Sequence, residues 1–237
     1  KTIIRLQLLS NKFFSIDEVL IMTNEKNRYL VLEQLEKINS NLKFRIILEP
    51  ISLNTAPSLT LASLAAPDSN LVVLPSDHYI KNDEALKSAI HKSIRHLEDN
   101  FIFLLGAKPV SANSSYGYIA YKGNEIIKNV TGFIEKPDST LAKKLISNDD
   151  YFWNLGIFIL RSNTWLKAIS VTNKLMYENV KKSWKKKTID NLFERPHKVI
   201  FSKSPSISID YAVLEKALSI NLKIKLREEF RPFAPAV

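Results

Sequence analysis

The stretch Leu71-Val72-Val73-Leu74-Pro75-Ser76-Asp77-His78 is the part of this 237-residue chain that decides the fold class. Its four consecutive apolar residues predict a strand covered on both faces, and a second such run, Phe101–Leu105, follows an amphipathic segment. Asn82 is placed to cap the intervening helix. A strand, a helix and a second strand predict a βαβ unit in a mostly parallel sheet. In such sheets ligands gather at the carboxyl ends of the strands, where Asp77 lies.

The same alternation of strands and helices extends toward the N-terminus, and it changes after residue 116. Before that point we predict strands at 18–22 and 44–48 and helices at 24–38 and 55–65. After it we predict strands at 116–121, 131–135 and 153–160, with short helices near 139–147, 162–170 and 209–218. The second half is therefore expected to be an antiparallel or mixed extension of the sheet, and residues 223–237 to be a tail.

The composition is that of an ordinary globular protein, with 45% apolar and 24% charged residues. The chain has no cysteine, which excludes disulfides, zinc–thiolate sites and a cysteine nucleophile. It has no run of about 18 apolar residues and no signal-peptide pattern. We therefore expect a cytoplasmic protein with no membrane partner.

The formal net charge is +10. Such a charge is compatible with binding of nucleic acid or anionic small substrates, and equally with a lysine-rich solvated surface. The densest run is Lys181-Lys182-Ser183-Trp184-Lys185-Lys186-Lys187, in which Trp184 is expected to pack inward. No nucleic-acid-binding motif accompanies it, so a nucleic-acid partner is not expected.

Six short motifs place carboxylates, a lysine, an amide and two glycines near the ends of predicted strands. They are Glu49-Pro50 with Asn54-Thr55-Ala56-Pro57, Pro75-Ser76-Asp77-His78, Tyr116-Gly117-Tyr118, Phe133-Ile134-Glu135-Lys136-Pro137-Asp138, Trp153-Asn154-Leu155-Gly156 and Ser208-Ile209-Asp210-Tyr211-Ala212-Val213-Leu214-Glu215-Lys216. Together these residue types suit a phosphorylated sugar and a metal-bound nucleotide.

On these motifs the chain resembles the sugar-nucleotide pyrophosphorylases, and most closely the bacterial mannose-1-phosphate guanylyltransferases, from about residue 19 to 216. The resemblance implies a Rossmann-like nucleotide-diphospho-sugar transferase fold, an α/β/α sandwich with a mixed, mostly parallel central sheet. It implies one domain over 1–237, with a nucleotide-binding half (1–110), a sugar-phosphate half (111–222) and a tail (223–237). The implied reaction converts GTP and mannose 1-phosphate to GDP-mannose and pyrophosphate.

The resemblance also implies roles for individual residues. Asp77 would hold Mg²⁺, a hard ion that prefers carboxylate oxygen; the alternative is a helix or turn cap. Lys136 would contact the sugar phosphate as a point charge, or be a surface lysine before a turn. Glu135 would accept hydrogen bonds from sugar hydroxyls, or be a surface carboxylate at a strand end.

Further residues of the same half are expected to surround the sugar. Asn154 offers amide donors and an acceptor to vicinal hydroxyls, or caps a strand bend. Gly117 and Gly156 would let the backbone approach the sugar, or mark bulges. Asp210 and Glu215 would face the sugar site, or lie on a solvated helix face.

Three residues are expected near the guanine base, whose Watson–Crick edge presents N–H donors. Glu49 and Asn54 offer acceptors for these donors, and Thr55 follows them. The alternative is a strand-to-helix loop with Thr55 as the helix N-cap.

The sequence departs from the family pattern at three places. The family's Gly-rich phosphate loop is not found, Ser52-Leu53 stands where Gly-Arg is expected, and no Gly-Trp-x-Asp segment with a second metal carboxylate follows Lys216. We therefore expect the chain as given to be truncated or to have little transferase activity. Two alternatives stay open: a non-catalytic sugar-phosphate or nucleotide-sugar binder, and a pyrophosphorylase of different nucleotide specificity. Association into a homo-oligomer also stays open.

Overall fold

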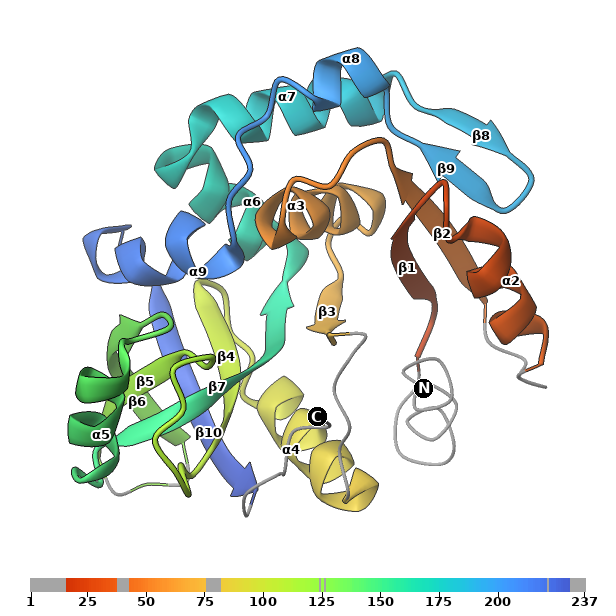
Figure 1. Cartoon of the computed structure of the whole chain (residues 1–237). Helices are drawn as coiled ribbons and strands as arrows, with labels where there is room; N and C mark the ends of the chain where they lie inside the picture. The colour runs from red at the N-terminus through yellow and green to blue at the C-terminus, as the bar shows by residue number, and fades with distance from the viewer. Residues whose placement is uncertain are drawn as a thin grey trace.

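The strands assemble into two sheets in the part of the chain that the structure describes (Figure 1). This computed structural model describes residues 16–37, 43–75, 82–123, 125, 127–220 and 222–230, without the side chains of 218, 219 and 227–230. The smaller sheet has the order β1-β2-β9-β8, and the larger has the order β3-β7-β4-β10-β6-β5. Additional pairing between β7 and β5 curls the larger sheet back on itself.

The elements have the following bounds. The strands are β1 (Val19–Asn24), β2 (Phe44–Glu49), β3 (Asn70–Val73), β4 (Phe101–Ala107), β5 (Tyr118–Lys122), β6 (Ile127–Ile134), β7 (Tyr151–Arg161), β8 (Thr188–Asp190), β9 (Phe193–Arg195) and β10 (Lys223–Phe230). The helices are α2 (Arg28–Glu36), α3 (Thr55–Ala65), α4 (Asp83–Arg95), α5 (Ser139–Ile146), α6 (Ser162–Thr172), α7 (Lys174–Lys185), α8 (Lys198–Phe201), α9 (Ile209–Ala212) and the 3₁₀ segment η1 (Leu214–Ile220).

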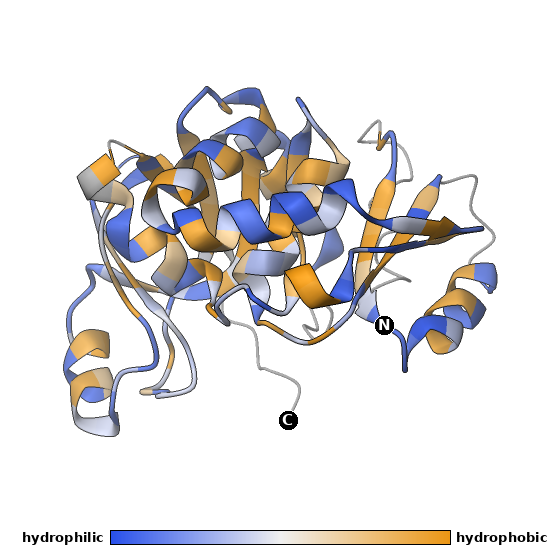
Figure 2. Cartoon of the chain, turned by 90° about the horizontal axis from the view of Figure 1, so that it is seen from above, coloured by the Kyte–Doolittle hydropathy of each residue, from blue (hydrophilic) through white to orange (hydrophobic). Residues whose placement is uncertain are grey.

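Strand β4 shows why the larger sheet is covered on both faces. Ile102 and Leu104 belong to the main core with α3, α6 and α7, whereas Phe103 and Leu105 belong to a second core with α4. All four are buried, because successive side chains of a strand point to opposite faces. Figure 2 shows strands coloured mostly as hydrophobic between helices that alternate between hydrophobic and hydrophilic. The predicted α/β/α layering is confirmed for this sheet.

Strand β3 differs from its sequence-based prediction. It pairs antiparallel with β7 and is an edge strand of the larger sheet within the described residues. The side chain of Val72 is 36% exposed. A short apolar run is therefore not sufficient evidence for a parallel strand covered on both faces, because the pairing partner is chosen by tertiary contacts.

Parallel pairing is less common than predicted. Among the described strands, β1–β2, β2–β9 and β4–β10 are parallel, and the other six pairings are antiparallel. The α/β class with a mixed sheet is confirmed, whereas the emphasis on parallel pairs was wrong. Strand β7 lies between β3 and β4 in the sheet, and β10 lies between β4 and β6, although both follow these strands in the sequence.

The predicted tail contains a central strand. Residues 223–230 form β10, which lies parallel to β4 and antiparallel to β6. Ile224 and Leu226 are buried in the main core. The assignment of 223–230 to a tail was therefore wrong, and residues 231–237 lie outside the described part.

Local signals placed several helices well. Helix α3 has the predicted bounds, and Asn82 Oδ1 accepts a hydrogen bond of 2.9 Å from the Ala85 N–H as the predicted N-cap of α4. The predicted helix 209–218 is instead two short segments, α9 and η1. None of the described helices is both long enough and apolar enough to cross a membrane.

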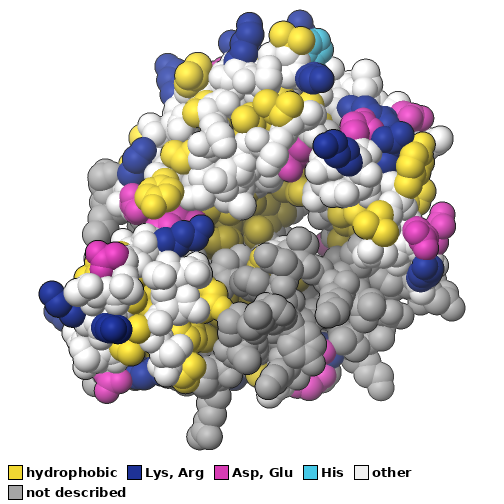
Figure 3. All heavy atoms as spheres, in the orientation of Figure 1, with side chains coloured by type: hydrophobic (Ala, Val, Ile, Leu, Met, Phe, Trp, Pro, Cys, Tyr) yellow, Lys and Arg dark blue, Asp and Glu magenta, His cyan; other side chains and the backbone are white. Residues whose placement is uncertain are grey.

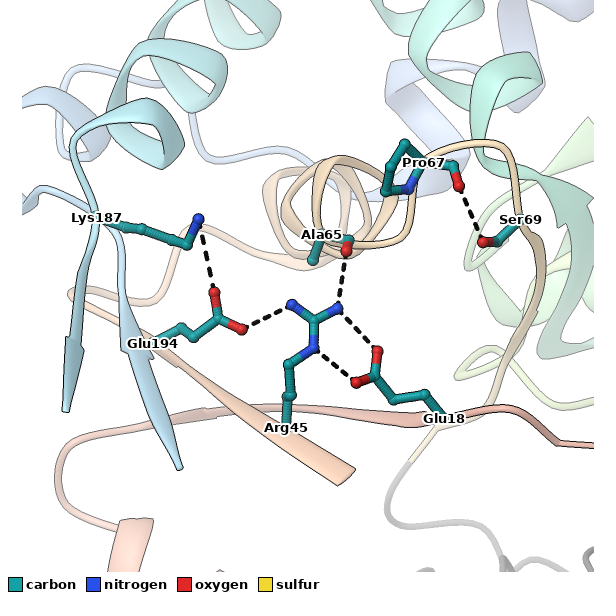
Figure 4. A network of polar contacts seen from close by, with 7 residues as sticks. All are labelled: Glu18, Arg45, Ala65, Pro67, Ser69, Lys187 and Glu194. Carbon is teal, nitrogen blue, oxygen red and sulfur yellow. Dashed lines mark hydrogen bonds and ion pairs between the residues drawn. The ribbon is translucent and has the colours of Figure 1, made fainter. Parts of the chain in front are cut away.

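An ionic network joins the smaller sheet to α3 (Figure 4). Arg45 on β2 makes two hydrogen bonds of 2.8 Å to the carboxylate of Glu18, one of 2.8 Å to Glu194 and one of 2.8 Å to the Ala65 carbonyl. Lys187 lies 3.7 Å from the second oxygen of Glu194, which is buried. One guanidinium thus holds β1, β9 and the end of α3 around β2.

Candidate functional site

The predicted sugar-site residues Asn154, Gly156 and Asp210 meet where β7 and α9 approach each other. Asn154 Nδ2 donates a hydrogen bond of 3.1 Å to Asp210 Oδ1, across 56 positions of sequence. Asn154 Oδ1 accepts one of 2.9 Å from the Gly156 N–H, where the chain has a positive φ of 61°. The Asn154 amide is therefore oriented from both ends. One amide hydrogen and one carbonyl lone pair remain for a ligand.

Gly117 is packed against this cluster. Its carbonyl accepts a hydrogen bond of 2.8 Å from the Asn154 N–H. A Cβ atom at this position would lie 2.6 Å from Glu135 Oε2 and 3.4 Å from Asn154 Cβ. The structure thus explains a glycine here by the close approach of the Glu135 carboxylate.

Lys136 stands at the edge of the cluster. Its backbone has a positive φ of 45° two positions after the end of β6, where the chain turns out of the strand. Its Nζ lies 3.8 Å from Glu135 Oε1, and its side chain is 66% exposed while that of Glu135 is 14% exposed. Lys136 can therefore reach a ligand from the rim while Glu135 stays in the interior.

The cluster has more negative than positive charge. Burial raises the pKa of Glu135, and the neighbouring carboxylates Asp210 and Glu215 raise it further, while Lys136 opposes them. Burial also raises the pKa of Asp210, with Glu215 adding to the effect. Acceptor oxygens in partly desolvated surroundings suit the hydroxyl donors of a sugar. A phosphate group would be favoured only at the Lys136 edge.

Figure 3 shows this part of the surface in the orientation of Figure 1. Asp and Glu side chains meet a Lys or Arg side chain at the rim of a hollow whose floor is apolar. The exposed Glu215, the second residue of η1, adds a carboxylate near the cluster. The residues predicted for the sugar site therefore lie in one group of side chains.

The predicted base-site residues lie at the start of α3. Asn54, not Thr55, is the N-cap: its Oδ1 accepts a hydrogen bond of 2.8 Å from the Thr55 N–H, at a φ of 68°. Glu49 Oε1 accepts a hydrogen bond of 2.5 Å from the Ser58 hydroxyl. Burial raises the pKa of Glu49, and this hydrogen bond opposes the shift.

Thr55 connects the two groups of residues. Its hydroxyl oxygen accepts a hydrogen bond of 3.0 Å from the Ile209 N–H, directly before Asp210. Two backbone hydrogen bonds lie beside it, from Ala56 N to Ile207 O at 3.1 Å and from Ile207 N to Leu53 O at 3.2 Å. Sequence reasoning missed this link, for which the family-like motifs at 54–57 and 208–216 were the available signal.

The predicted metal ligand Asp77 lies outside the described residues. Within the described ranges, no group of three His, Cys, Asp or Glu side chains is arranged to hold a metal ion.

The chain is similar to several known proteins. A family model described as nucleotidyl transferase matches residues 1–198. The xanthan biosynthesis protein XanB of Xanthomonas campestris is 34% identical over 201 residues, covering 83% of this chain and 43% of that protein. Mannose-1-phosphate guanylyltransferase RfbM of Salmonella typhimurium is 34% identical over 211 residues, covering 85% and 43%.

A solved structure also resembles the whole chain. It is described as mannose-6-phosphate isomerase from Helicobacter pylori, with a TM-score of 0.86 and 25% identity over 98% of this chain and 90% of that one. This chain spans less than half the length of the two curated relatives. The match to the family model over most of the sequence shows that the chain belongs to the nucleotidyl transferase family.

Proposed function

We propose that this chain acts in the mannose-1-phosphate guanylyltransferase reaction, in which GTP and mannose 1-phosphate give GDP-mannose and pyrophosphate. The relative from Salmonella typhimurium bears that name, and family membership supports a nucleotidyl transfer. A cytoplasmic location is part of this proposal.

The meeting of Glu135, Asn154 and Asp210 beside Lys136 carries the proposal. The oriented Asn154 amide and the two partly desolvated carboxylates offer donors and acceptors to the hydroxyls of a hexose. Lys136 offers a cation to the phosphate on the first carbon of that sugar. A hexose 1-phosphate has these two ends, neutral hydroxyls and an anionic phosphate.

The chemical step requires the sugar phosphate to be held in line with the α-phosphorus of GTP. A phosphate oxygen of the sugar attacks this phosphorus, a new P–O bond forms, and the bond to the bridging oxygen breaks to release pyrophosphate. Such transfers depend mainly on positioning and on compensation of charge. Lys136 compensates charge on the sugar phosphate, and Asp210 positions Asn154 through the hydrogen bond between them.

The start of α3 is the proposed guanine site. The Watson–Crick edge of guanine presents N–H donors, and Glu49 and Asn54 offer acceptor oxygens at this helix start. The Thr55–Ile209 hydrogen bond keeps this segment beside α9, which carries Asp210. Nucleotide and sugar sites would then be adjacent, as the transfer requires.

Magnesium is the finer part of the proposal and rests on sequence. Asp77 follows an apolar strand within Pro75-Ser76-Asp77-His78, and a divalent ion held there would offset polyphosphate charge.

Calorimetry with mannose 1-phosphate tests the sugar site in the full 1–237 chain. Lys136→Gln and Asn154→Ala should each weaken binding by about 10-fold, the loss expected for one charged or well-oriented hydrogen bond. Lys143→Gln is the matched control, because Lys143 is an exposed lysine of the nearby helix α5. Equal effects of Lys136→Gln and Lys143→Gln would contradict the assignment.

A second measurement separates catalysis from binding alone. Pyrophosphate release is followed with each nucleoside triphosphate and each hexose 1-phosphate. Release only with GTP and mannose 1-phosphate supports the proposal. Tight mannose 1-phosphate binding without release under any pairing would support the non-catalytic alternative, and release with UTP would point to another nucleotide specificity.

A further inference from the structure

The outer side of α7 carries a stripe of lysines. Lys181 and Lys185 follow Lys174 by 7 and 11 residues, which is close to two and three helical turns. The three lysines therefore lie on one side of α7, together with Lys182. The stripe is roughly 16 Å long at 1.5 Å per residue. The opposite side is buried against α3, α6 and α8 through Met176, Val180 and Trp184.

Helix α8 and its flanks extend this stripe. Asn179 Nδ2 donates a hydrogen bond of 3.0 Å to the Lys203 carbonyl, and the His197 N–H donates one of 3.1 Å to the Ser183 carbonyl. These bonds fix the segment around α8 beside α7. We call the combined surface the basic face; its members are Lys174, Lys181, Lys182, Lys185, Lys186, Lys198 and Lys203.

The basic face concentrates the charge of the whole protein. Residues 174–203 contain nine Lys or Arg and three Asp or Glu, a net charge of +6 out of +10. Glu194 and Asp190 pair with Arg45, Lys187 and Arg195, away from the face. Glu178 lies beside Lys181. The pKa of Lys181 is raised mainly by its hydrogen bond to the Tyr177 hydroxyl, and Glu178 adds a smaller effect. In the described part of the chain, none of the seven lysines forms an ion pair.

Exposed aliphatic side chains lie among the lysines. Val171 at the end of α6, Leu175 on α7 and Val199 on α8 are 66%, 63% and 61% exposed. Figure 3 shows dark-blue basic and yellow apolar side chains interspersed over the end of the molecule that carries α7 and α8. The exposed aromatic residues of the described part, Tyr29 and Tyr211, are on α2 and α9 instead.

We propose that the basic face docks on an anionic phospholipid surface. Lysines near such a surface gain attraction, and interspersed aliphatic side chains can enter the boundary between headgroups and acyl chains. Single-stranded nucleic acid is the competing polyanion, but its binding surfaces combine cations with exposed aromatic rings on which bases stack. Tyr177 on α7 is half-buried beneath Lys181, and Trp184 is buried, so the face offers aliphatic contacts in place of such rings.

Co-sedimentation of the 1–237 chain with vesicles tests the proposal. Vesicles of phosphatidylcholine with phosphatidylglycerol should bind the protein, and phosphatidylcholine alone should not. Replacing Lys182, Lys185 and Lys186 together by Gln should lower the partition coefficient about 100-fold, from a loss of about fivefold per lysine. Replacing Lys122, Lys143 and Lys144 by Gln removes the same charge elsewhere and should change it by less than about twofold.

A second pair of substitutions separates lipid from nucleic acid. Leu175→Ser with Val199→Ser keeps the charge and should weaken vesicle binding about 10-fold. It should leave binding to a single-stranded RNA oligonucleotide unchanged. Far-UV circular dichroism confirms that each variant is folded.

Three results would overturn the proposal. The first is absence of binding to anionic vesicles at low salt. The second is an equal loss from the two triple-Gln variants, which would assign the effect to net charge alone. The third is vesicle binding that survives Leu175→Ser with Val199→Ser while the RNA oligonucleotide binds more tightly than the vesicles.

Discussion

Replacing Gly117 by Ala adds one methyl group at the most crowded point of the sugar site. The new Cβ would lie 2.6 Å from Glu135 Oε2 and 2.9 Å from the Cζ atom of Phe133. An oxygen and a methyl carbon need roughly 3.2 Å or more, so the Glu135 carboxylate has to move by about 0.6 Å or adopt another rotamer, and the Phe133 ring has to shift slightly as well. The change should therefore displace one functional group while leaving the chain path intact.

The expected effect of Gly117→Ala on stability is smaller than its expected effect on sugar binding. Overpacking costs about 1–3 kcal/mol, but the crowded oxygen is the end of a flexible side chain, and Gly-to-Ala substitution gains about 0.4–1 kcal/mol through the unfolded state. The free energy of unfolding should thus fall by no more than about 2 kcal/mol. Loss of one charged hydrogen bond to a sugar hydroxyl costs about 1.5–3 kcal/mol, which is about 10- to 100-fold in the dissociation constant.

Gly132→Ala is the matched control, because a Cβ there meets only Ala120 Cβ, at an ordinary 3.5 Å. Urea denaturation measures stability, and calorimetry measures mannose 1-phosphate binding for both variants. Gly117→Ala should weaken binding well beyond its effect on stability, and Gly132→Ala should change neither strongly. Unchanged affinity in a folded Gly117→Ala protein would refute the placement of Glu135 in the sugar site.

Four further perturbations have definite expected outcomes. Burial raises the pKa of Glu135 above its ordinary 4.5, so ionisation of this carboxyl lowers the stability of the fold as pH rises from the ordinary to the raised pKa. In thermal denaturation, Glu135→Gln should lessen this loss of stability and raise the melting temperature at neutral pH. Asn54→Gly should raise the free energy of unfolding in urea by about 0.5–1 kcal/mol, because relief of the strain at a φ of 68° exceeds the few tenths of a kcal/mol lost with the cap bond to Thr55, and a lower value would contradict this. Arg45→Met leaves the buried Glu194 short of its partner and should lower the same quantity by about 2–3 kcal/mol, whereas a loss below about 0.5 kcal/mol would show the network to be energetically neutral. Asp77→Asn should abolish the Mg²⁺ dependence of GTP binding in calorimetry, and a retained dependence would place the metal elsewhere.

Local sequence signals were sufficient wherever the deciding interactions lie within a few residues. Helix α3 begins and ends as predicted, and Asn82 caps α4 through a bond to Ala85, three positions away. Strand β4 was predicted from its apolar run because an interior strand is apolar whichever neighbours it has. The motifs identified the residues that come together in the proposed sugar site.

Pairing and convergence were decided by the tertiary structure. The charged pattern of 223–230 gave no strong sign of a central strand, yet β10 lies between β4 and β6, where its buried residues Ile224 and Leu226 fill the core. Strand β3 was predicted as a strand, but its antiparallel partner β7 is about 90 residues away in the sequence. Which strands pair, and which strand lies at the edge of a sheet, depend on which apolar faces remain uncovered after the whole chain has packed.

The sequence by itself placed strands β1 to β7 and helices α2 to α6, and it supplied the family motifs and the chemical types of the candidate site residues. Only the tertiary structure decided that Asn154 bonds to Asp210, that Glu135 occupies the space left by Gly117, and that Thr55 joins the start of α3 to α9. The physical reason is range: caps and periodicity act over one or two helical turns, whereas a site is made by contacts between segments tens of residues apart, which form only when the core closes.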